Sequence, residues 1–136
     1  MRAAIKCVVT TAIGSICLLG SATAAELTGA EIKDLISGKS VYLELTASIT
    51  GTQGQGIIYY DPNGTALYKT PKGVMWHGTW KIDGNTACTD WKEQANNPCT
   101  KYDKQGDTIS TINVATGVAR GKVTKSVPGN AEKLTP

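Results

Sequence analysis

The chain has 136 residues, a formal net charge of +3 and 40% hydrophobic residues. This length suffices for one domain, and the hydrophobic content excludes a disordered chain. The small charge argues against nucleic acid as a partner, because a protein that follows a phosphate backbone needs a clustered basic face. We also predict no metal centre and no cofactor, since the sequence has one histidine and lacks phosphate-binding glycine loops and haem-attachment motifs.

The first 24 residues have the pattern of a secretory signal peptide. Arg2 and Lys6 precede the apolar or small residues 7–20, and a small-x-small site at residues 22–24 places cleavage before Ala25. The apolar run is shorter than the roughly 20 residues that a membrane-spanning helix needs. Cleavage would remove two basic and no acidic residues and leave 112 residues with a net charge of +1. We therefore expect a periplasmic or secreted protein with no membrane span after cleavage.

Cys88 and Cys99 are the two cysteines that remain after this cleavage. Because an exported protein reaches an oxidising compartment, we predict a structural disulfide between them. The alternatives are a redox pair and a metal pair. Redox pairs are usually C-x-x-C, whereas ten residues separate these two cysteines. A metal pair would need further Cys or His side chains nearby.

A short helix is predicted over residues 29–37. Thr28 and Glu31 have the spacing of a capping box, in which each side chain accepts a hydrogen bond from the other residue's backbone. Three apolar residues then recur at i, i+3 and i+4, which is one face of a helix. Gly38 suits the left-handed position that ends a helix.

The rest of the sequence predicts strands. Short runs rich in Ile, Tyr, Thr, Trp and Val alternate with turn signals. We expect strands near residues 40–50, 56–61, 65–70, 74–82, 86–92, 99–104, 107–114 and 118–124. Hairpin-length connections favour an all-β fold, a seven- to eight-stranded antiparallel up-and-down barrel or sandwich with one short N-terminal helix.

Two further features concern the end of the chain. Ile109 and Ile112 differ in parity, so we expect a bulge or an edge in the last strands. The β-domain is expected to span residues 25–127. Residues 128–136 have no periodicity and are expected to form a flexible tail.

Trp76, Trp80 and Tyr59 are the candidate ligand-contacting residues. The two tryptophans share one face of a predicted strand, with Gly78 between them to let a neighbouring side chain approach. They are either core anchors or part of a cavity wall, and an eight-stranded barrel is just wide enough to hold one small ligand. Tyr59 and Tyr60 point to opposite faces of their strand, and we take Tyr59 as the candidate.

No catalytic residues are predicted. A hydrolase would have to use Asp90 or Glu44 with His77, but the sequence shows no nucleophile–base–orienter set and no G-x-S-x-G motif. The basic residues at positions 120–125 are interpreted as solvated surface.

Two stretches carry a resemblance to a known family. The first is LTGAEI at residues 27–32 with GKSV at 38–41, and the second is GTWKIDGN at 78–85, followed by Trp91 between the two cysteines. Together they resemble a family of small exported alphaproteobacterial proteins of unknown function. The resemblance implies a periplasmic location and a lipocalin-like β architecture. It supplies no activity and no catalytic residues.

The expected function is that of an exported, non-enzymatic β-barrel that binds a small molecule or acts as an accessory protein of the envelope. The alternative is a protein–protein interaction module, such as an inhibitor or an envelope accessory factor, and a hydrolase ranks last. A cavity lined by Trp or Tyr would favour ligand binding, whereas a filled barrel would favour the interaction module.

Overall fold

The computed structural model describes residues 23–46 and 53–136. Most of the expected signal peptide and the end of the expected strand 40–50 lie outside the described residues. The elements in chain order are β1 (Ala25–Glu26), α1 (Gly29–Ile36), β2 (Lys39–Leu45), β3 (Gly54–Tyr60), β4 (Thr65–Lys69), β5 (Met75–Asp83), β6 (Thr86–Trp91), β7 (Thr100–Gln105), β8 (Thr108–Asn113) and β9 (Ala119–Pro128).

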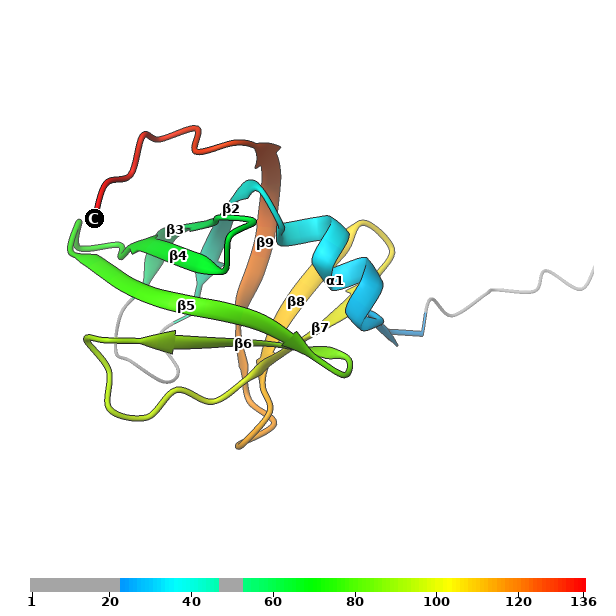
Figure 1. Ribbon diagram of the computed structural model, residues 1–136. Coiled ribbons are helices and arrows are strands. Elements are labelled where there is room, and N and C mark those ends of the chain that lie inside the picture. The colour runs from blue at the N-terminus through cyan, green and yellow to red at the C-terminus, as the bar shows by residue number, and fades with distance from the viewer. Residues whose placement is uncertain (1–22, 47–52) are drawn as a thin grey trace, which may run out of the picture.

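Strands β2 to β9 form a closed antiparallel barrel (Figure 1). Each strand pairs with the next one along the chain, and β9 returns to pair with β2. This arrangement confirms the predicted all-β up-and-down barrel with one short helix and decides between a barrel and a sandwich. β9 runs further than predicted, to Pro128.

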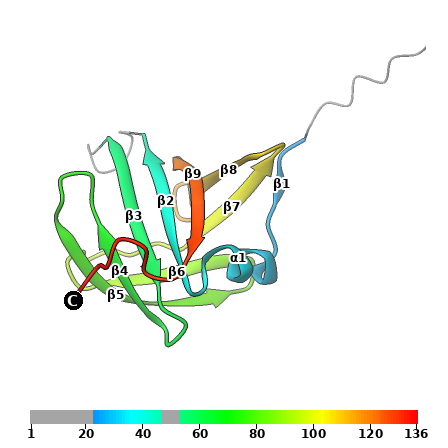
Figure 2. The same cartoon turned by 90° about the horizontal axis from the view of Figure 1, so that it is seen from above.

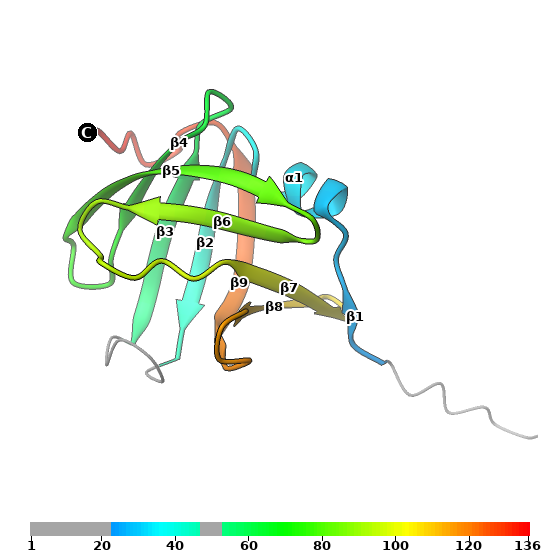
Figure 3. The same cartoon turned by 60° about the horizontal axis from the view of Figure 1, so that its bottom comes forward.

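Helix α1 packs against one end of the barrel (Figure 3). Its predicted capping box is present, because Glu31 N donates to Thr28 Oγ1 at 3.3 Å and Thr28 N donates to the Glu31 carboxylate at 2.7 Å. Ile32 and Ile36 are fully buried in the core, so the apolar face of the helix fills this end of the barrel. No helix in the described ranges has both the length and the apolar character needed to cross a membrane.

The barrel wall has a seam between β6 and β7. These strands pair at one position only, Ala87 with Thr100, and the predicted disulfide joins Cys88 to Cys99 directly beside that pair. Further along β7, the short strand β1 pairs with the edge that β6 leaves free. The sequence did not predict β1, because two residues are too few to show an alternating pattern.

The predicted irregularity in the last strands is a β-bulge at Arg120. Thr111 of β8 pairs with Gly121, but the next residue, Ile112, pairs with Ala119. Arg120 is therefore the extra residue on β9. A bulge bends its strand and re-aims side chains away from simple alternation.

The sequence predicted a flexible tail over residues 128–136. Pro128 belongs to β9, and residues 129–136 contain neither helix nor strand and run back along the barrel wall (Figure 2). Leu134 is only 8% exposed. The Ser40 hydroxyl donates to a carbonyl of this segment at 2.8 Å, and the Tyr42 hydroxyl donates to Glu132 at 2.5 Å. The segment thus covers the outer face of β2. A single apolar residue has no periodicity, so the sequence pattern held no sign of these contacts.

Candidate ligand-binding cavity

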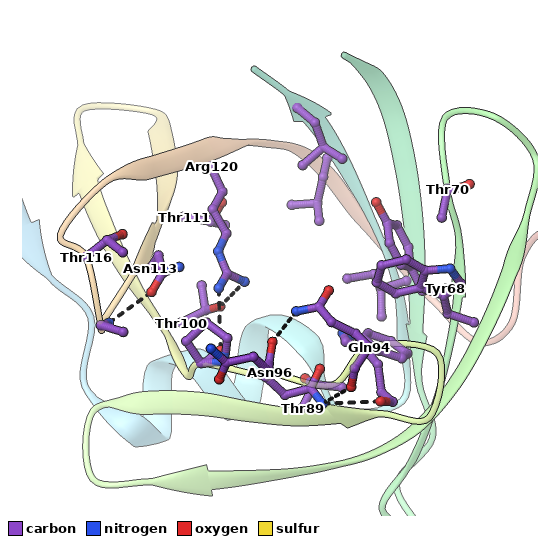
Figure 4. Close-up of a pocket in the computed structure, with 18 of the residues that line it drawn as sticks. Tyr68, Thr70, Thr89, Gln94, Asn96, Thr100, Thr111, Asn113, Thr116 and Arg120 are labelled. Atoms are coloured by element: carbon purple, nitrogen blue, oxygen red, sulfur yellow. Dashed lines mark hydrogen bonds between the residues drawn. The ribbon is translucent and has the colours of Figure 1, made fainter. Parts of the chain in front are cut away.

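The end of the barrel away from α1 holds a cavity of about 500 Å³. The helix packs beside the start of β2 and the β5–β6 turn, whereas the cavity is lined by residues such as Leu45, at the end of β2, and Trp76, near the start of β5. The interior is therefore packed at one end and hollow at the other. Figure 4 shows Tyr68 on one side of this cavity and Asn113 and Thr116 on the other.

Three aromatic side chains form one wall of the cavity. The ring centroids of Tyr68 and Trp76 are 5.6 Å apart, those of Tyr68 and Trp91 are 5.6 Å apart, and those of the two indoles are 6.4 Å apart. The rings meet edge-on or tilted, which are the favoured arrangements for aromatic pairs. We call Tyr68, Trp76 and Trp91 the aromatic wall. It offers a ligand a large apolar surface.

Two glycines make room for this wall. A Cβ on Gly56 would lie 2.8 Å from the Tyr68 ring. A Cβ on Gly78 would lie 2.4 Å from the backbone oxygen of Asp90 and 3.0 Å from the Trp91 ring. Gly78 was expected to let a neighbouring side chain approach. In the structure it allows the close approach of both the Trp91 side chain and the backbone of β6.

The connection between β6 and β7 supplies a polar side of the cavity through Gln94, Asn96 and Asn97. The Asn97 amide nitrogen donates to Asp90 Oδ1 at 2.9 Å, to the carbonyl of Trp91 at 3.2 Å and to the carbonyl of Gln94 at 2.9 Å. These bonds fold the connection back on the end of β6. They hold polar groups at the cavity in a segment that has no regular structure.

Arg120 reaches from the bulge on β9 into the middle of the cavity (Figure 4). Nη1 donates to Thr100 Oγ1 at 3.1 Å, and Nη2 donates to the carbonyl of Pro98 at 3.5 Å. Burial lowers the pKa of the guanidinium from its usual value, but arginine retains its charge in proteins. The interpretation of Arg120 as solvated surface was wrong. The bulge on β9 turns this side chain inward.

No acidic side chain neutralises Arg120. All eleven Asp and Glu residues of the chain lie in the described ranges, and none of them lines the cavity or forms a salt bridge with the guanidinium. The phenols nearby are neutral at physiological pH. Burial raises the pKa of Tyr60 and Tyr102 above the ordinary value and that of Tyr68 to about 12. The cavity therefore contains one uncompensated positive charge.

The structure separates the three predicted ligand-contacting residues. Trp76 lines the cavity. Trp80 is partly buried and packs against the core, with its ring centroid 5.5 Å from that of Tyr60, and its indole N–H donates to the carbonyl of Asp61 at 2.8 Å. It also borders a second pocket, of about 380 Å³, beside the disulfide. Tyr60 lines the cavity and Tyr59 does not. Of the two neighbouring tyrosines, the one that was not chosen as the candidate is the one that faces the cavity.

The residues considered for a hydrolase do not come together. His77 Nδ1 lies 2.7 Å from a Glu93 oxygen, whereas Asp90 accepts from Asn97. Glu44 is on β2, and two strands, β3 and β4, separate it from the β5 strand of His77. Over the described part of the chain, no group of three or more His, Cys, Asp or Glu side chains is placed to hold a metal ion.

Comparisons with protein-family models, with curated proteins and with solved structures find no match for this chain. Fold and cavity together define the class of protein. It is a small lipocalin-like β-barrel with one short helix at its packed end and a cavity at the other.

Proposed function

We propose that this chain is an exported, non-enzymatic protein whose barrel cavity binds a small ligand. The observation that carries the proposal is the cavity of about 500 Å³ beside the aromatic wall. Small-molecule sites have volumes of about 300–1,000 Å³ and are mostly apolar, with a few placed polar groups. A filled barrel would have favoured the interaction module instead. Ligand binding therefore ranks first.

The two sides of the cavity offer different chemistry. Tyr68, Trp76 and Trp91 supply apolar contact, and Asn97 and Arg120 supply polar contact. A ligand with an apolar body and a polar end would satisfy both sides at once. Rigid aromatic rings lose little side-chain entropy when a ligand binds, which favours a site of this kind.

Export is the second half of the proposal. It is supported by the signal-peptide pattern in the first 24 residues, by the Cys88–Cys99 disulfide and by the resemblance to exported alphaproteobacterial proteins. Expression of the full chain in a Gram-negative host, followed by fractionation and intact mass measurement, tests it. We expect a periplasmic product that begins at Ala25 and contains the disulfide. An uncleaved product in the cytoplasm would contradict this part of the proposal.

Ligand binding is tested by native mass spectrometry of the purified protein and by tryptophan fluorescence against a panel of apolar and amphiphilic small molecules. We expect a bound compound or a saturable fluorescence change. Trp76→Ala should weaken binding by about two- to tenfold, since an aromatic contact contributes about 0.5–1.5 kcal/mol. Met75→Ala, at a neighbouring position that does not line the cavity, is the matched control. A protein that carries nothing and ignores the whole panel would contradict the proposal.

A further inference from the structure

Arg120 is a charged group in an unusual setting. Moving an ion out of water is costly unless it gains a partner of opposite charge. The Arg120 guanidinium is partly buried, and its protein partners are the neutral hydroxyl of Thr100 and the carbonyl of Pro98. All acidic residues of the chain are described, and none of them forms an ion pair with Arg120. The positive charge in the cavity therefore has no negatively charged protein partner.

The guanidinium also has unused hydrogen-bonding capacity. It carries five N–H donors in a planar fork, and two protein bonds from it are present. The fork matches the two oxygens of a carboxylate and the oxygens of a sulfonate or phosphate. Neutral hydroxyls and carbonyls do not use this geometry fully.

The backbone gives a second, independent reason to regard Arg120 as placed for a ligand. A bulge interrupts the β8–β9 ladder at this residue and thereby turns a long basic side chain into the barrel. Bulges occur preferentially at barrel rims and beside active sites, where they re-aim a side chain. A purely structural link from β9 to Pro98 and Thr100 would need no positive charge, because both protein acceptors are neutral.

The aromatic wall defines the rest of the ligand. Tyr68, Trp76 and Trp91 line the same cavity as Arg120, so one molecule can contact both. The cavity of about 500 Å³ has room for more than a small inorganic ion. An apolar or flat body is the partner that such a wall favours.

We infer that the ligand is a small organic anion, with a carboxylate or sulfonate paired to Arg120 and an aromatic or other apolar body against Tyr68, Trp76 and Trp91. This inference rests on the proposed ligand-binding function and names the chemical class that the cavity selects.

Two fluorescent probes that share one aromatic body provide the test. Anilinonaphthalene sulfonate is anionic, and N-phenyl-1-naphthylamine is its neutral counterpart. Both are titrated into the disulfide-bonded protein, mutual displacement establishes a shared site, and the ratio of their affinities is measured. The wild type should prefer the anionic probe, and this preference should decrease with added salt.

Substitutions assign the preference to Arg120. Arg120→Met should reduce the ratio about 10- to 100-fold, because a hydrogen bond to a charged group contributes about 1.5–3 kcal/mol. Arg120→Lys keeps the charge but loses the fork, and should reduce the ratio less. Lys122→Met removes an equal charge from an exposed position on the same strand and should leave the ratio unchanged. If Arg120→Met does not fold, as judged by circular dichroism, Arg120→Lys provides the test. A several-fold reduction of the affinity ratio in that variant then supports the inference, and an unchanged ratio overturns it.

The outcomes separate the two proposals. If the neutral probe binds in the cavity but the ratio is the same in the wild type and the Arg120 variants, this inference is overturned and ligand binding stands. If neither probe binds, the proposed function itself fails. An equal reduction in Lys122→Met would also overturn the inference, because net charge rather than the cavity would then explain the preference.

Discussion

Three tyrosines line the cavity that contains Arg120. Tyr60 and Tyr102 are buried in the core, and Tyr68 belongs to the aromatic wall. Burial raises the pKa of all three phenols, to about 12 for Tyr68, and the Arg120 charge partly opposes the shift. A phenolate here would compensate the guanidinium, but its formation requires strongly alkaline conditions.

These shifts predict an alkaline loss of stability. In the unfolded chain the phenols titrate near pH 10, so above that pH the folded state binds more protons than the unfolded state. The free energy of unfolding should therefore be retained below about pH 10 and fall as the pH rises, between about 10 and 12 for Tyr68. Urea unfolding at a series of pH values measures this. Tyr68→Phe should flatten the decrease, and unchanged wild-type stability at about pH 11 would refute the prediction.

Gly78 gives a second test at the scale of one residue. A methyl group there would lie 2.4 Å from the backbone oxygen of Asp90, and β6 has to move to accommodate it. We expect Gly78→Ala to lower the free energy of unfolding by about 1–3 kcal/mol and to disturb the Trp91 fluorescence. Thr79→Ala, at the exposed neighbouring position, should change stability by less than about 0.5 kcal/mol. Equal effects of the two substitutions would show that β6 does not approach this closely.

Among the elements, β6 and β7 have the weakest connection in the barrel wall. One backbone pair, Ala87 with Thr100, is supplemented by the disulfide. Thr89 and Asn97 border both the main cavity and the smaller pocket beside the disulfide. The wall is therefore thin at this seam, and the cross-link holds it together.

Removal of the disulfide should destabilise the barrel. Replacing Cys88 and Cys99 by serine should lower the free energy of unfolding by about 3 kcal/mol in the chain-entropy account of a short loop. Urea unfolding with and without reductant measures the effect. Reductant should bring the wild type to the stability of the double variant and leave the variant unchanged. A wild type that is indifferent to reductant would show that the seam does not depend on the cross-link.

Helix α1 and strands β2 to β9 could be predicted because each has a local pattern. The Thr28–Glu31 capping box and the alternating strands are visible in a few consecutive residues. A bulge or an edge was expected from the parity of the last strands. The pattern did not identify Arg120 as the inserted residue, because the insertion depends on pairing between β8 and β9. The covering of β2 by residues 129–136, through Ser40 and Tyr42, likewise depends on contacts far apart in the sequence.

At the scale of the whole molecule, the barrel has a packed end and a hollow end. Trp76 and Trp80 share a face of β5 but are four residues apart, about 13 Å along a strand. The alternating pattern predicts which face a residue occupies, not its depth along the barrel axis. Depth separates the cavity tryptophan from the core tryptophan.

The most direct test of the cavity as a ligand site follows the three indole N–H signals in a ¹H–¹⁵N spectrum. N-phenyl-1-naphthylamine is added to the labelled protein, and a Trp80→Phe variant assigns the core indole. We predict that the signals of Trp76 and Trp91 move together and saturate, while that of Trp80, which donates to Asp61, stays in place. Unchanged signals for Trp76 and Trp91 at saturating probe, or a shift confined to Trp80, would contradict the account.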